Sequence, residues 1–133
     1  MSVRVDKNTA AKLAKELRAI TQEAKVDTLA IITTTGARVA FFTKSTADPS
    51  EFSAISASLQ NAANLAVSRV GFGETTDIMV RCKSGFLILR NLGRFILVAG
   101  ARNIETFTTS ASVLVQHSPN IDEILSVIPE DQY

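Results

Sequence analysis

Hydrophobic residues change their spacing several times along this chain, and the order of these changes predicts the order of the elements. Leu13, Leu17, Ile20 and Ala24 recur at intervals of four, three and four, which predicts a helix over about 8–25. Either Asn8 or Thr9 is expected to cap it. Two runs rich in β-branched and aromatic residues follow at 28–34 and 37–43, and Thr35-Gly36 between them predicts a hairpin turn.

A long helix rich in Ala and Ser is predicted from Asp48-Pro49 to about Val70, where Gly71-Phe72-Gly73 ends it. Helical spacing predicts a core-facing stripe on this helix, made of Phe52, Ile55, Leu59, Ala63, Ala66 and Val70. A weaker second stripe holds Ala54, Ser58, Asn61 and Leu65. So many short side chains favour close approach of another backbone to this helix.

Three strands are predicted at 77–82, 86–90 and 94–101, and the short turns between them require an antiparallel meander. A helix then starts near Asn103, and Ser118-Pro119 is expected to break it before a short amphipathic segment at 121–128. That segment either packs as a final helix or docks in the groove of a partner.

The chain is therefore predicted to form one α+β domain over residues 1–133, with short tails at 1–7 and 129–133. Both the odd-numbered and the even-numbered positions of the first strand are apolar, and these positions point to opposite faces. Helices are therefore expected on both faces of the sheet. The predicted fold is a five-stranded antiparallel sheet in the order α-β-β-α-β-β-β-α, plus a short C-terminal helix.

Composition and motifs exclude several classes of function. A net charge of +1 gives no broad basic field for nucleic acid, and one cysteine excludes an internal disulfide framework. No apolar run is long enough to span a bilayer, and the N-terminus lacks a signal core, so a cytoplasmic protein is expected. There is no phosphate-binding loop and no metal motif, so we expect no cofactor and no catalysis.

The residues that could suggest chemistry have ordinary interpretations. His117 is expected at a helix end, near the last carbonyls, and Cys82 is expected to be a buried or interface thiol. Basic residues recur in the meander and its exit, where they are either solvated or form a rim for an acidic partner or lipid headgroups. They are Arg81, Lys83, Arg90, Arg94 and Arg102.

The ordered set of elements resembles the roadblock/dynein light chain family from about Leu13 to Leu114. The pieces that match are the Gly-centred hairpin at 29–40, the Ser-Ala-rich helix at 52–59, the hairpin formed by 78–80 and 85–89, and the last strand at 95–99. Thr35 departs from the family, which often has Asp before the turn glycine.

The resemblance implies a non-enzymatic protein that forms homodimers, or heterodimers with a paralogous roadblock subunit. It implies a platform that binds and regulates a small Ras-like GTPase or scaffolds a signalling or motor complex. The alternative is a PAS-like or profilin-like module that senses or binds a ligand, which needs a cavity with convergent polar groups.

Two surfaces are predicted for such a platform. The dimer interface is expected to join strand edges and middle helices through Ala54, Ser58, Asn61, Leu65, Ile78, Val80 and Cys82. The partner-binding surface is expected on the outer side of the middle helices, at Ala57, Asn61, Asn64 and Ser68.

Overall fold

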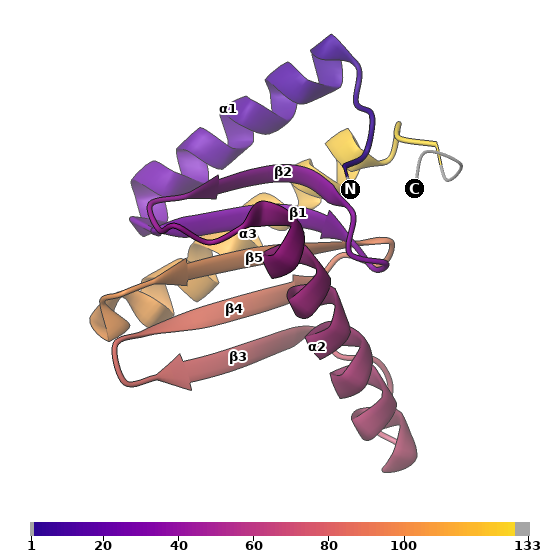
Figure 1. Ribbon diagram of the computed structural model, residues 1–133, viewed down its shortest axis with the longest axis vertical. Helices are drawn as coiled ribbons and strands as arrows, with labels where there is room; N and C mark the ends of the chain where they lie inside the picture. The colour runs from indigo at the N-terminus through magenta and orange to yellow at the C-terminus, as the bar shows by residue number, and fades with distance from the viewer. Residues whose placement is uncertain (1, 130–133) are drawn as a thin grey trace.

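The computed structural model describes residues 2–129 and arranges them as a five-stranded antiparallel sheet with helices on both faces (Figure 1). The elements in chain order are α1 (Lys7–Ala24), β1 (Thr28–Thr33), β2 (Arg38–Thr43), α2 (Pro49–Arg69), β3 (Asp77–Cys82), β4 (Gly85–Asn91), β5 (Phe95–Ala101), the 3-10 turn η1 (Ile104–Thr106) and α3 (Phe107–Leu125). The strand order across the sheet is β2-β1-β5-β4-β3. The predicted fold class and element order are confirmed.

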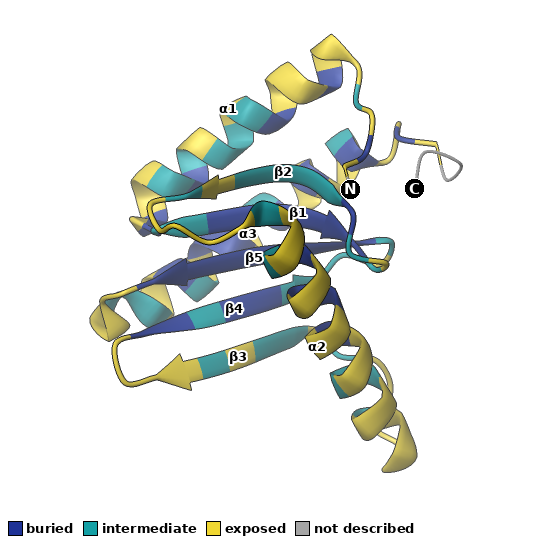
Figure 2. Ribbon diagram, in the orientation of Figure 1, coloured by how far each residue is buried: buried dark blue, intermediate teal, exposed yellow. Residues whose placement is uncertain are grey.

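The sheet carries a separate apolar layer on each face. On one face, Leu29, Ile31 and Leu97 pack beneath α1 and α3. On the other face, Ile32 and Val98 belong to a smaller layer beneath α2. The central strands are therefore buried on both sides, as the apolar residues on both faces of the first strand predicted (Figure 2). The two edges of the sheet are β2 and β3.

The first helix begins slightly earlier than its predicted cap. Asp6, rather than Asn8 or Thr9, is the N-cap residue, and its Oδ1 accepts a hydrogen bond from the backbone N–H of Thr9 at 2.8 Å. That backbone bond holds the pKa of Asp6 below its usual value. Thr9 itself lies inside the helix and is buried.

The break predicted at Ser118-Pro119 is wrong, because α3 runs without interruption to Leu125. Proline removes one helical hydrogen bond, to the carbonyl four residues earlier. Val115 and Pro119 both lie on the exposed side of α3, where water can satisfy that carbonyl. Beyond the proline, Ile121, Leu125 and Ile128 are buried, so the 121–128 segment packs on the domain.

Candidate interaction surface

The middle helix, α2, packs against the sheet through a different face from the one predicted. Its buried residues are Ser53, Ser56, Ala57 and Gln60. The predicted core stripe is wrong at Ile55 and Val70, whose side chains are 60% and 61% exposed. Leu59 in that stripe is also exposed, and Phe52 is the one large member that contacts the core beneath α2.

The reason is that the sheet already fills this layer with large side chains. Ile32, Leu89 and Ile96 are fully buried there, so the helix can approach only through small residues. The same close approach occurs at the hairpin turn, where a Cβ added to Gly36 would lie 3.1 Å from the Cα of Ala54. Small residues thus let the sheet and the hairpin turn approach α2 closely, and their part in a dimer interface stays a prediction.

As a result, α2 presents large apolar side chains away from the sheet. Figure 1 shows that its C-terminal part extends past β3, and Figure 2 shows exposed positions along its length. The large apolar residues that this helix and the turn after it expose are Ile55, Leu59, Leu65, Val70 and Phe72. An outward face this rich in apolar residues is unusual in a solvated helix, so it is the candidate interaction surface.

The edge strand β3 lies beside this face. β3 pairs with β4 on one side only, so the hydrogen-bonding groups of its outer edge can accept another strand. Ile78 contacts the apolar layer beneath α2, and Val80 and Cys82 share its side of the strand. All three residues are at least partly accessible in the single chain.

The residues predicted for the dimer interface therefore lie on two adjacent elements. Ala54, Ser58, Asn61 and Leu65 are all exposed on α2. Sequence reasoning missed Ile55, Leu59 and Val70 as members of this surface, because it assigned them to the core. One feature of the sequence could have revealed this surface. The helix has two apolar stripes, and only one of them can face a single sheet.

The residues predicted for partner binding differ in how far the structure exposes them. Asn61 and Ser68 are exposed, whereas Ala57 is only 3% exposed and belongs to the apolar layer beneath α2. The outward orientation assigned to Ala57 is therefore wrong. Asn64 is partly buried, because its Oδ1 accepts hydrogen bonds from the backbone N–H and the hydroxyl of Thr75 at 3.1 and 2.6 Å.

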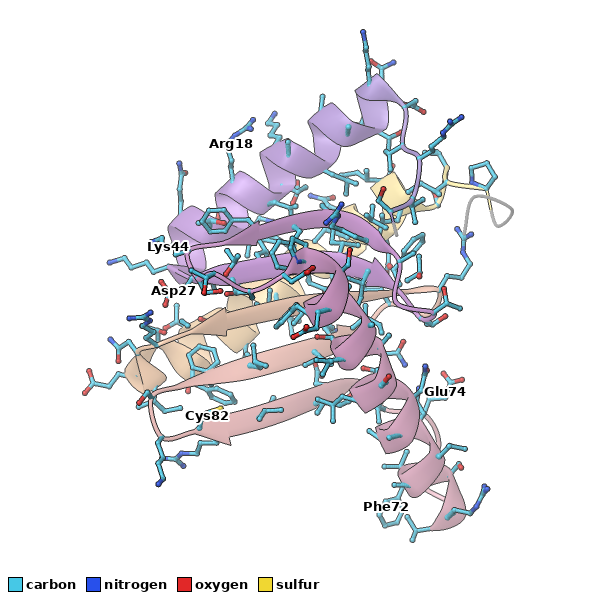
Figure 3. The ribbon with its side chains drawn as sticks, in the orientation of Figure 1. Arg18, Asp27, Lys44, Phe72, Glu74 and Cys82 are labelled. Carbon is cyan, nitrogen blue, oxygen red and sulfur yellow. The ribbon has the colours of Figure 1, made fainter. Side chains whose placement is uncertain are left out.

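Polar contacts join the middle of α2 to the sheet, before its projecting end. Gln60 donates to the Thr75 hydroxyl, and Asn91 of β4 donates to the Thr75 carbonyl at 2.8 Å. Thr75 thus joins α2 to β4, close to the turn that carries Phe72. Gly71 and Gly73 flank that turn residue with φ values of +77° and +82°, and Figure 3 shows Phe72 at the far end of α2.

His117 lies inside α3 and not at a helix end, so the predicted environment is wrong. Its Nδ1 lies 2.7 Å from Oε2 of Glu16, and its Nε2 lies 3.0 Å from Oε2 of Glu23. Burial lowers the pKa of His117, but the two carboxylates outweigh burial and raise the pKa above its usual value. The ring therefore joins α3 to α1.

Two of the basic residues noted in the meander have structural partners. Arg90 pairs with Asp77 at 2.9 Å and also donates to the Ser118 hydroxyl at 2.8 Å, while Arg94 donates to the Ile128 carbonyl at 3.2 Å. Burial raises the pKa of Asp122, and the nearby Arg90 guanidinium opposes that effect. Arg90 and Arg94 thus help to hold α3 and the residues after it, while Arg81, Lys83 and Arg102 are exposed.

Within residues 2–129, no group of three or more His, Cys, Asp or Glu side chains is placed to hold a metal ion. Over the same residues, no helix combines the length and apolar character needed to cross a membrane. Cys82 is exposed at the end of β3, as Figure 3 shows, and not buried in the single chain.

Comparison with known proteins agrees with this geometry. The sequence model of the Roadblock/LC7 domain matches residues 12–101. MglB of Myxococcus xanthus aligns with a TM-score of 0.85 at 14% identity, over 96% of this chain and 97% of that chain. The gliding protein MglB of Thermus thermophilus gives a TM-score of 0.82 at 14% identity, over 94% and 96% of the two chains.

A further similar structure, described as MglB with a tetrameric arrangement, has a TM-score of 0.78 and 14% identity over 99% of this chain and 98% of that chain. At these identities the similarity shows the fold alone. No curated protein matches the sequence.

Proposed function

Since the chain belongs to the Roadblock/LC7 domain family, we propose that it is a non-enzymatic homodimeric platform that binds and regulates a small Ras-like GTPase. The observation that carries the proposal is the apolar outer face of α2 beside the open edge of β3. A second copy, or a paralogous roadblock subunit, would cover this face and extend the sheet.

Two-fold symmetry explains how one surface can serve both copies. An isologous interface uses the same patch twice, so β3 would pair with the β3 of the mate while the α2 helices lie side by side. The interface would include Leu65 and Val80, together with Ile55 and Leu59. A stable interface of this kind buries at least about 1,000 Å² in total.

The GTPase would bind along the flank of α2 that carries Asn61 and Ser68, next to the β1–β2 turn, where the Asn61 amide donates to the Thr34 carbonyl at 3.0 Å. Asn61 and Ser68 are short, uncharged and exposed, so a globular partner can approach them without desolvating a charge. Ala57 and Asn64 would act indirectly, by holding α2 on the sheet. The similarity to MglB supports the proposal at the level of the fold.

Binding to small Ras-like GTPases from the source organism tests this proposal. Each GTPase would be loaded with GDP or a GTP analogue, and its affinity for the full chain would be measured by calorimetry. Ser68→Arg should weaken binding at least tenfold, because a long charged side chain would have to be desolvated in the interface. Gln116→Arg is the matched control, since Gln116 is exposed on α3, on the opposite face of the sheet.

Light scattering must show that both variants keep the native mass. If no small GTPase binds in either nucleotide state, the platform function is wrong. If Ser68→Arg and Asn61→Arg both bind normally, the GTPase does not use this flank of α2.

A further inference from the structure

The opposite side of the molecule carries a groove that the proposed dimer does not use. The groove lies between α1 and β2, has a volume of about 250 Å³, and is lined only by apolar residues. Its walls are Val5, Ala10, Leu13, Ala14, Leu17, Val39, Ala40 and Phe41. Because β2 and β3 are opposite edges of the sheet, a copy paired through β3 would leave this groove open.

Cations occupy the solvent-facing side of α1, next to the groove. At 100° per residue, Lys7, Lys15 and Arg18 fall within about 80° on the exposed face of α1, next to Ala14 in the groove wall. None of the ion pairs within residues 2–129 involves these three cations. Figure 3 shows Arg18 on the side of α1 that faces away from the sheet.

The acidic side chains of α1 face elsewhere. Glu16 and Glu23 both contact His117 of α3, so they lie on the other flank of the helix. Asp6 caps the helix by accepting from Thr9. The helix therefore keeps its acids and Lys12 toward α3 and its other cations toward solvent beside the groove, although the whole chain has a net charge of only +1.

The edge of β2 adds a second recognition element. Ser2 forms a parallel bridge with Arg38, and the Val3 N–H donates to the Arg38 carbonyl at 2.7 Å, so an extended segment already pairs at the start of this edge. Past Arg38, no strand within residues 2–129 covers the outer side of β2. An incoming strand could continue the sheet there.

From these observations we propose that the groove between α1 and β2 binds an extended acidic segment of another protein. Its backbone pairs with the free edge of β2, its apolar side chains fill the groove, and its carboxylates lie opposite Lys7 and Arg18. The occupant is a protein segment and not a lipid surface, because the apolar wall is concave. The outer arc between the cations holds only Ala11 and Gln22, which cannot insert into a bilayer.

A peptide titration tests the chemistry of the groove. The probe is a fluorescent peptide of about ten residues with valine at the central alternate positions that face the groove, threonine between them and glutamate at both ends, and its partner peptide replaces every glutamate with lysine. The full-length protein should bind the acidic peptide at least tenfold more tightly than the basic one. Raising the ionic strength should weaken this binding, since the cations are solvent-exposed.

Matched variants test the location. Arg18→Glu should weaken binding of the acidic peptide at least fivefold, whereas Lys83→Glu, with the same change in charge on the β3–β4 turn, should not. Ala14→Phe should fill the groove and weaken binding to a similar extent, whereas Ala11→Phe on the outer arc should not. Circular dichroism should show that all four variants keep their fold.

Nuclear magnetic resonance provides a direct readout of the binding surface. The acidic peptide should shift the amide signals of residues 38–43 and 10–18 and leave those of 77–82 unchanged. Equal binding of the two peptides, or shifts confined to α2 and β3, would overturn the proposal. So would co-sedimentation with phosphatidylserine vesicles in the absence of any binding to the acidic peptide, because the occupant would then be a lipid surface.

Discussion

His117 shows how one residue can couple two helices of this domain. The ring lies between two carboxylates of α1, and both ring nitrogens face an oxygen within 3.0 Å. Only the doubly protonated ring can donate to both carboxylates at once. The geometry therefore favours the charged form, which agrees with the raised pKa.

The consequence is a stability term that depends on pH. Because the folded pKa of His117 is raised, its contribution is fully present below the ordinary value of 6.5 and is lost as the pH rises through the folded pKa. His117→Gln should reduce the free energy of unfolding by about 1–2 kcal/mol at about pH 5.5, and by less at about pH 8.5. Urea unfolding at the two pH values measures this difference.

Gln116→Ala provides the control, because this exposed neighbour in α3 contributes no titrating group. Its pH dependence should match that of the unmodified chain. A penalty for His117→Gln that is equal at both pH values would show that the ring acts by packing and not by charge.

At the scale of the element, α2 packs closely on the sheet because the side chains on its buried face are small. Ala57 contacts a layer in which Ile32, Leu89 and Ile96 are already fully buried. Ala57→Leu should therefore lower the free energy of unfolding by about 1–3 kcal/mol through overpacking. Ala11→Leu, the same substitution on the exposed face of α1, should change it by less than about 0.5 kcal/mol.

Thermal and urea unfolding of the two variants provide the test. If Ala57→Leu proves as harmless as Ala11→Leu, the contact between α2 and the sheet is looser than the fully buried side chains indicate.

In α3, replacing the proline measures how much one missing helical hydrogen bond costs the stability of the fold. Pro119 lies within α3 and has no N–H to donate to the carbonyl of Val115. Pro119→Ala should restore that bond and raise the free energy of unfolding by about 1–3 kcal/mol. No gain, measured by urea unfolding, would mean that water already satisfies the carbonyl at little cost.

The errors at α2 and α3 have one physical origin. The apolar patterns and turn residues located the strands and helices, except that α3 continues past Pro119, because these patterns are local properties of the chain. Which stripe of α2 faces the sheet depends on how full the opposing layer is, and residues 29–32 and 86–98 decide that. Likewise, whether Pro119 ends a helix depends on tertiary packing of Ile121 and Leu125, which local propensity does not include.

At the scale of the whole molecule, the two sides of the sheet differ in what remains uncovered. The face beneath α1 and α3 is held closed by the contacts of Arg90, Arg94 and His117, except at the groove between α1 and β2. The other face is crossed by α2 alone, and the outer side of that helix is apolar. The segment at 121–128, which the sequence allowed as a detachable docking helix, packs within the closed layer.

This asymmetry predicts that the chain self-associates through α2 and β3. The proposed interface contains Leu65, whose side chain is 59% exposed in the single chain, and Val80 on the adjoining edge strand. Light scattering at about micromolar concentration should give twice the mass of one chain, because an interface of standard size supports such an affinity. The melting temperature should also rise with protein concentration, since association stabilises only the folded state.

Leu65→Arg and Val80→Arg should each convert the dimer to a monomer, because the charge would be buried without a counterion twice in every two-fold interface. Val127→Arg is the matched control, because Val127 is 62% exposed just after α3, away from both β3 and α2. The control should keep the dimer mass. A monomer in the unmodified chain, or a dimer that persists in both interface variants, would mean that the apolar face of α2 receives a different partner.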